Sequence, residues 1–246
     1  MASSVIAPGI ITLSGTFDVS ITVATLALSL YVLGWALGPL IASPVSEIYG
    51  RRIVLIPTHF LFVAALCGVA VSNNIETLLI CRFLAGIFSS PVTAVAAGFC
   101  YDLFAQNEVG PPIYVIILCS CLGPAIGPLA GGYMLQFFGW RWMMWFAAIV
   151  NGADLLIWVR FPETNASVLL KNKCAALQKK TGNKDLRSTD HGQTTAQVMR
   201  TAIFRPFQLL VLEPIVMFTT LFVSFIWGTM YLYFGVSCFP GSCLVR

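Results

Sequence analysis

Two ionisable side chains lie inside long apolar stretches of the chain, where a charge is costly and usually has a function. Arg82 lies near the start of the apolar stretch 78–101, and Asp154 follows Asn151 within the stretch 140–161. A carboxylate in an apolar stretch can take up a proton or hold a cation, and an arginine there should face a cavity or a partner. Asp154 is therefore a candidate proton or cation site, and Arg82 and Asn151 are candidate residues of a cavity beside it.

Plainer roles remain open for these residues. Arg82 can extend its head group to the outer interface, because long basic side chains reach water from the end of an apolar helix. Asp154 can pair with Arg160 or contact water directly. Tyr31 and Trp35 are candidate cavity residues, although contacts with lipid or packing explain them equally well.

A glycine- and proline-rich run inside another apolar stretch is the most unusual local feature. It comprises Gly123, Pro124, Gly127, Pro128, Gly131 and Gly132. Each glycine or proline costs a soluble helix roughly 1 to 3 kcal/mol relative to alanine, whereas small residues let membrane helices approach closely. Because three of the glycines recur at every fourth position, they form one smooth stripe. The stripe predicts a close helix contact, with or without a further role.

The elements that must position these residues are apolar helices. A hydrophobic fraction of 58%, only 10% charged residues and a mean hydropathy of +0.85 exclude an ordinary soluble domain. Six segments have about the 20 residues that a spanning helix needs; they are 21–42, 53–71, 78–101, 112–137, 140–161 and 207–234. We expect an all-α polytopic membrane protein with a bundle over 1–161, a loop over 162–206, a last span over 207–234 and a tail over 235–246.

Basic residues predict the orientation of these spans. Arg51 and Arg52 lie between the first two spans, and nine Lys and Arg residues lie in or beside the long polar segment after the fifth span. Because an even number of spans separates these groups, both face the same side, which the positive-inside rule assigns to the cytosol. The net charge of +4 is therefore a topology signal, with no nucleic-acid partner implied.

The sequence offers no catalytic, metal or cofactor site. None of the spans carries a nucleophile-elbow or H-E-x-x-H pattern, and the eight cysteines show no metal-type spacing. His59 and His191 lack an evident partner in the sequence, so we interpret His59 as a packing residue. The lipid bilayer is the expected environment, and no protein partner is indicated.

Several motifs resemble those of the major facilitator superfamily, specifically its fungal drug:proton antiporter branch. Residues 123–132 match every specified position of the G-x-x-x-G-P-x-x-G-G signature of its proton-coupled antiporters. Residues 43–52 are similar to the loop motif G-x-L-A-D-R-x-G-R-R, with Glu47 in the acidic position and Gly50, Arg51 and Arg52 matching. Arg82 and Gly86 have the spacing of the R-x-x-x-G element, which the family associates with proton coupling. Residues 101–104, including Asp102, are similar to A-D-L-F, and residues 161–164 resemble the P-E-T ending of the sixth helix.

The resemblance implies a fold and an activity. It implies two six-helix halves around a central substrate site, of which this chain matches a partial first helix to the seventh. It also implies export of small organic or cationic compounds in exchange for protons, with Glu47, Gly50, Arg51, Arg52 and Asp102 forming a gating charge cluster. The plasma membrane is the expected location, with the vacuolar membrane the alternative. A truncated, non-transporting membrane remnant or interaction subunit is the alternative function.

Overall fold

All regular elements that the computed structural model describes are helices, and six of these are long and apolar enough to span a membrane. The structure describes residues 2–105, 107–160, 163, 169–170, 173–174, 177–178 and 195–237; the side chains of residues 47, 97, 195–203 and 234–237 are left undescribed. The described helices, in chain order, are η1 (Ala7–Gly9), α1 (Ile10–Phe17), α2 (Ile21–Tyr49), α3 (Arg51–Val71), α4 (Ile75–Leu103), α5 (Gly110–Phe138), α6 (Trp140–Arg160), α8 (Thr195–Leu212) and α9 (Pro214–Ser237).

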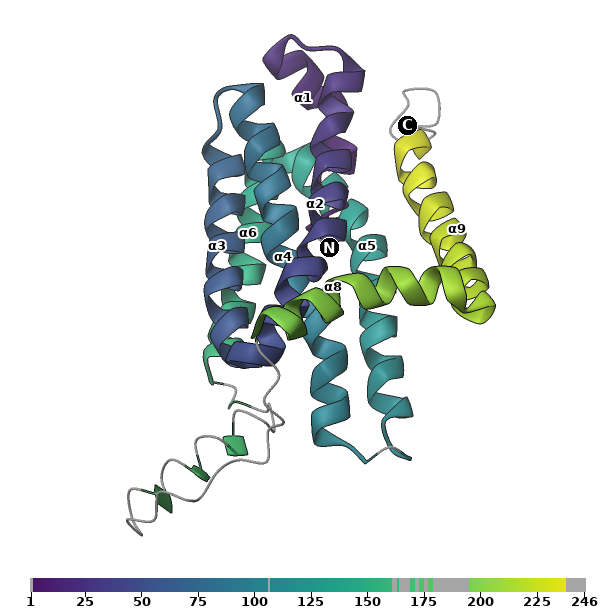
Figure 1. Cartoon of the computed structure of the whole chain (residues 1–246). Coiled ribbons are helices and arrows are strands. Elements are labelled where there is room, and N and C mark those ends of the chain that lie inside the picture. The colour runs from purple at the N-terminus through teal and green to yellow at the C-terminus, as the bar shows by residue number, and fades with distance from the viewer. Residues whose placement is uncertain are drawn as a thin grey trace.

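The first five predicted spans correspond to α2 to α6, which confirms the all-α polytopic fold. The prediction for the last span is wrong at its start, because residues 207–212 belong to α8 and the spanning segment is Pro214–Tyr233. Pro214 explains the break, since proline lacks a backbone N–H and is suited to the first position of a new helix. Helix α8 occupies the end of the predicted loop and runs across the spanning helices (Figure 1).

The described helices form a bundle in which α4 packs against α2 and α3, and α3 packs against α6. The N-terminal segment begins in the middle of this bundle (Figure 1). Its side chains Val5 and Ile6 are completely buried. The segment therefore forms part of the core, and η1 contacts both α5 and α9.

Glycines bring α2 and α4 into backbone contact. A Cβ atom added at Gly34 of α2 would clash with the carbonyl oxygen of Phe83, and one added at Gly86 of α4 would clash with the carbonyl oxygen of Tyr31. Each glycine thus faces main-chain atoms of the opposite helix, the small-residue packing that membrane helices favour. This contact fixes Tyr31 and Trp35 relative to α4.

Prolines in the spanning helices free carbonyl groups that hydroxyl side chains then satisfy. Pro128 has no N–H to donate to the carbonyl of Pro124, four residues earlier, and the Ser4 hydroxyl donates to that carbonyl at 3.0 Å. Pro91 likewise cannot donate to the Ile87 carbonyl, which accepts from the Ser90 hydroxyl at 2.8 Å. Neighbouring side chains therefore compensate for both proline breaks, as is required away from water.

Candidate functional site

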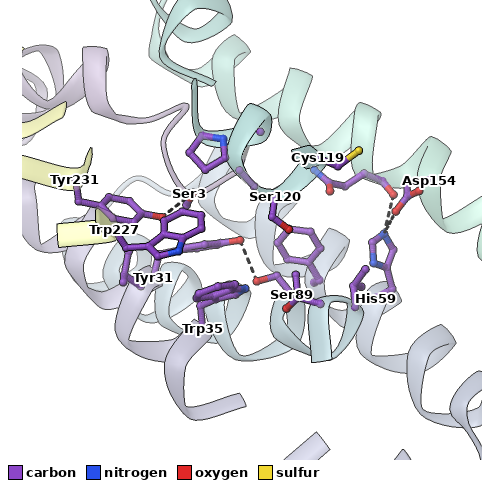
Figure 2. Close-up of a pocket in the computed structure, with 18 residues that line it drawn as sticks. Ser3, Tyr31, Trp35, His59, Ser89, Cys119, Ser120, Asp154, Trp227 and Tyr231 are labelled. Carbon is purple, nitrogen blue, oxygen red and sulfur yellow. Dashed lines mark hydrogen bonds and ion pairs between the residues drawn. The ribbon is translucent and has the colours of Figure 1, made fainter. Parts of the chain in front are cut away.

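A cavity of about 220 Å³ lies where α2, α3, α4, α5, α6, α9 and the N-terminal segment meet (Figure 2). Its polar end carries His59, Asn151 and Asp154, and its aromatic end carries Tyr31, Trp35, Trp227 and Tyr231. Figure 2 shows these two ends on opposite sides of the cavity, with Ser89 and Ser120 between them. The arrangement suits a ligand that has both an apolar ring and a polar or charged group.

The polar end is built by α3 and α6. Asp154 Oδ2 accepts a hydrogen bond from Trp158 Nε1 at 3.0 Å and lies 3.6 Å from His59 Nε2. The Asp154 side chain is 45% exposed, whereas the His59 side chain is only 3% exposed. Asn151 donates its amide to the Ala147 carbonyl on its own helix at 2.7 Å. The cavity therefore presents a negative charge that a cation or a proton can neutralise.

The aromatic end joins α2 to α9. The rings of Trp35 and Trp227 lie 6.4 Å apart, within the range of a favourable tilted pair. Tyr231 donates its hydroxyl to Ser3 Oγ at 3.3 Å, and Tyr31 donates to Ser89 Oγ at 2.9 Å. Because the four rings are held by partners on different elements, they form a fixed wall that can stack on a flat ring or face a cation.

Only some of the residues predicted from the sequence line the cavity. Asp154 and Asn151 line the cavity, as do Gly123 and Pro124 of the glycine-rich run. The remaining residues of the run lie outside the cavity wall: Gly127 is buried, Pro128 is partly buried, Gly131 faces the carbonyl of Val5, and Gly132 has no atom within 4 Å of an added Cβ. The run thus contacts the N-terminal segment with one face and the cavity with one end.

Arg82 is buried beside the cavity wall and is completely inaccessible. Its guanidinium donates to the Ala2 carbonyl at 3.0 Å and to the Met144 sulfur at 2.7 Å, and it lies 5.9 Å from the centre of the Tyr31 ring. The alternative in which Arg82 reaches the outer interface is therefore wrong. Arg82 instead ties the N-terminal segment to α4 and α6.

A second charge cluster lies where α3 begins. Arg51 Nε donates to Asp102 Oδ2 at 2.6 Å, and the guanidinium lies directly over Gly98, where a Cβ would clash with it. Gly50 adopts a φ of +106°, which only glycine accepts without strain. The side chain of Glu47 lies outside the described residues.

Glu163 completes this cluster and was missed in the sequence. Its carboxylate oxygens accept from the backbone N–H groups of Arg51 at 3.0 Å and Arg52 at 3.1 Å. A carboxylate there satisfies free donors and matches the positive end of the helix dipole. Arg52 donates from Nη2 to the Val159 carbonyl at 2.9 Å. The P-E-T resemblance identified the segment, but only the fold brings it to α3.

The Arg51–Asp102 pair should show measurable coupling. In a double-mutant cycle with Arg51→Gln and Asp102→Asn, we expect about 1 kcal/mol of interaction in the free energy of unfolding, because both side chains are mostly buried. Unfolding in SDS followed by tryptophan fluorescence measures it. Glu108→Gln, at an exposed acid, serves as the control and should show no coupling to Arg51→Gln. Additive effects of Arg51→Gln and Asp102→Asn would contradict the interpretation of the pair as a coupled cluster.

His59 is buried and hydrogen-bonded to the Asn151 carbonyl, as a packing histidine should be, but it also has a partner that the sequence did not show, because its Nε2 lies 3.6 Å from Asp154 Oδ2. One signal in the sequence could have found this contact. His59 and Asp154 lie within about 12 Å of the predicted cytosolic ends of their helices, at 1.5 Å per residue. Similar depth on two antiparallel helices makes a contact possible, but only the packing of α3 on α6 produces it.

Comparisons with known proteins identify the family. Residues 1–239 match the model of the Major Facilitator Superfamily. Over 89% of its own length, the chain is 40% identical to the transporter paaT of Penicillium rubens. Over 95% of its own length, it is 37% identical to the efflux pump FUBT of Fusarium oxysporum. It is 34% identical to the cycloheximide resistance protein of Candida maltosa over 95%. The chain spans 40%, 40% and 44% of these three relatives. From the match over residues 1–239, the chain belongs to the Major Facilitator Superfamily.

Proposed function

We propose that the chain acts in proton-coupled export of small organic compounds, including cations, by alternating access, as in the fungal drug:proton antiporter branch. The observation that carries the proposal is the cavity, in which the Asp154 carboxylate faces an aromatic wall within a bundle of apolar helices. The names of the relatives support this class of substrate, since they describe efflux pumps and a resistance protein. The plasma membrane is the proposed location, with the vacuolar membrane the alternative.

The remaining predicted residues have roles in this proposal that follow from their contacts. The Arg51–Asp102 pair and the Glu163 cap on Arg51 and Arg52, after the turn at Gly50, hold α3, α4 and the segment after α6 together in one state. Glu47 is proposed to join this cluster from the resemblance alone. Breaking these contacts would release the other state, as charge clusters do in switching proteins. Arg82 would sense the charge of the cavity through the Tyr31 ring.

Efflux of a fluorescent cation from cells tests the proposal. The chain is expressed in a yeast host lacking its own efflux pumps, the cells are loaded with rhodamine 6G, and loss of the dye is followed with and without a protonophore. We expect faster efflux than in the host alone, abolished by the protonophore. Correct membrane insertion without efflux would contradict the proposal and favour a non-transporting remnant or interaction subunit, which co-purification of a second chain would identify.

Asp154→Asn should reduce cation efflux by tenfold or more. A loss of about 1.4 kcal/mol in the attraction between the carboxylate and the cation corresponds to a factor of ten. The change removes the negative charge from the polar end of the cavity while preserving the size of the side chain. Efflux of an uncharged substrate should fall much less. The matched control is Asp18→Asn, because Asp18 lies after α1, outside the cavity wall, at a φ of 51° that asparagine tolerates. Equal loss for charged and uncharged substrates would show that Asp154 has a structural role only.

A further inference from the structure

His59 is held between the cavity and the core with one ring nitrogen engaged and the other free. Its Nε2 lies 3.0 Å from the carbonyl oxygen of Asn151. Because a carbonyl oxygen only accepts, Nε2 must carry a hydrogen, which fixes the tautomer of the neutral ring. The other nitrogen, Nδ1, is buried and has no hydrogen-bond partner in the described part of the chain. Nδ1 is therefore an open position for one further proton.

One carboxylate lies close to the His59 ring. Asp154 Oδ2 lies 3.6 Å from Nε2, so protonation of the ring would create an ion pair with the carboxylate. Among the described residues, the titratable groups of the cavity wall on other helices are Tyr31 of α2, Cys119 of α5 and Tyr231 of α9, all ordinarily uncharged. Helix α4 contributes only Ser89, Val92 and Thr93 to this wall, so Arg82 is absent from it. Asp154 and His59 are thus the only wall residues in the described part of the chain that can carry charge near neutral pH, and the buried Arg82 guanidinium lies behind the Tyr31 ring, 5.9 Å from its centre.

We infer that His59, and not Asp154, holds the proton that the cavity exchanges for a positively charged substrate; this rests on the proposed function. With His59 neutral, the Asp154 carboxylate gives the cavity one negative charge, and a monocation binds. When Nδ1 takes up a proton from the side to which the substrate is released, the imidazolium neutralises the carboxylate and the cation leaves. Loss of that proton to the opposite side restores the binding state. One proton therefore replaces one positive charge, and the exchange is electrically neutral.

Binding of tetraphenylphosphonium to the purified chain tests the inference. Histidine ordinarily changes charge between about pH 5 and pH 8, so affinity is measured across that range. We expect the dissociation constant to decrease with rising pH, by at most about tenfold per pH unit for one linked proton. His59→Gln keeps an N–H for the Asn151 carbonyl but cannot be protonated, so it should bind with the same affinity at every pH. Asp154→Asn should bind weakly throughout.

The only other histidine of the chain provides the matched control and a direct probe. His191→Gln should keep the pH dependence of the wild type. In that variant, His59 is the single imidazole, so its nitrogen resonances report its charge directly by NMR. Adding tetraphenylphosphonium below pH 7 should convert the imidazolium to the neutral ring with release of about one proton per cation bound. This measurement does not depend on whether His59→Gln folds.

Two outcomes would overturn the inference. If His59→Gln keeps the pH dependence, or if the His59 resonances do not change charge on cation binding, another group carries the proton. Efflux driven by protons would then still support the proposed function, with Asp154 as the proton site. If the wild-type chain binds no cation and shows no efflux, the inference and the proposed function fail together.

Discussion

Replacing Arg82 with methionine is expected to abolish proton-driven transport and leave the protein folded. The guanidinium is completely buried, and no carboxylate pairs with it among the described residues. A buried charge without an anion is costly, so an apolar side chain of similar length should not lower stability by much. The change does remove the donor to the Ala2 carbonyl and the charge beside Tyr31. Function and stability should therefore separate at this position.

The measurement uses proteoliposomes with an imposed pH gradient, alongside thermal unfolding in detergent. Arg141→Met is the matched control, because Arg141 is exposed, donates to the Asn73 side chain at 3.0 Å and lies over Trp140 at 5.2 Å. We expect that control to transport normally. Full pH-driven transport by Arg82→Met would show that the charge has no part in coupling. A collapse of the unfolding temperature would instead assign Arg82 to folding.

Gly86→Ala is expected to cause the largest loss of stability of any single methyl addition on α4. The new Cβ would clash with the Tyr31 carbonyl and would lie 3.0 Å from the backbone nitrogen of Trp35. Main-chain atoms of a helix cannot rotate away, so α2 and α4 must separate. Overpacking of this kind costs about 1 to 3 kcal/mol. The movement would also displace Tyr31 and Trp35 from the cavity wall, so substrate binding should weaken with stability.

Gly152→Ala provides the matched control on α6, since no atom lies within 4 Å of a Cβ added there. Alanine is the better helix former by about 1 kcal/mol, so this variant should be as stable as the wild type or slightly more stable. Thermal unfolding by size-exclusion chromatography compares the two. Equal stability of both variants would mean that α2 and α4 are not packed through Gly86.

Hydropathy alone was enough to predict α2 to α6, because a spanning helix must satisfy its own backbone in lipid and leaves a long apolar run in the sequence. The sixth span was misplaced because residues 207–212 are apolar enough to extend it, and hydropathy does not show that the helix stops before Pro214. Pro214 marks a helix start in the sequence, but the direction in which α8 crosses the bundle depends on tertiary packing.

The candidate site was predictable only in part. Asp154 was identified because a carboxylate in an apolar run is conspicuous, and the glycine run was identified by its own spacing. His59 and Glu163 were not, because their partners, Asp154 and the start of α3, are 95 and 112 positions away in the chain. The wall residues Trp227 and Tyr231 were missed for the same reason, since aromatic residues in a span are usually lipid contacts.

The hydrogen bond from the Ser4 hydroxyl to the Pro124 carbonyl links the bending of α5 to the position of the N-terminal segment. A proline-interrupted helix is most pliable at the turn whose carbonyl lacks its regular donor. In α5 that donor is supplied by a hydroxyl on a different segment, so the stiffness of the turn is set from outside the helix. If the N-terminal segment moved away from α5, the Pro124 carbonyl would lose this donor and the turn would become more pliable. Bending of α5 at Pro124 is therefore coupled to the position of the N-terminal segment through this hydrogen bond.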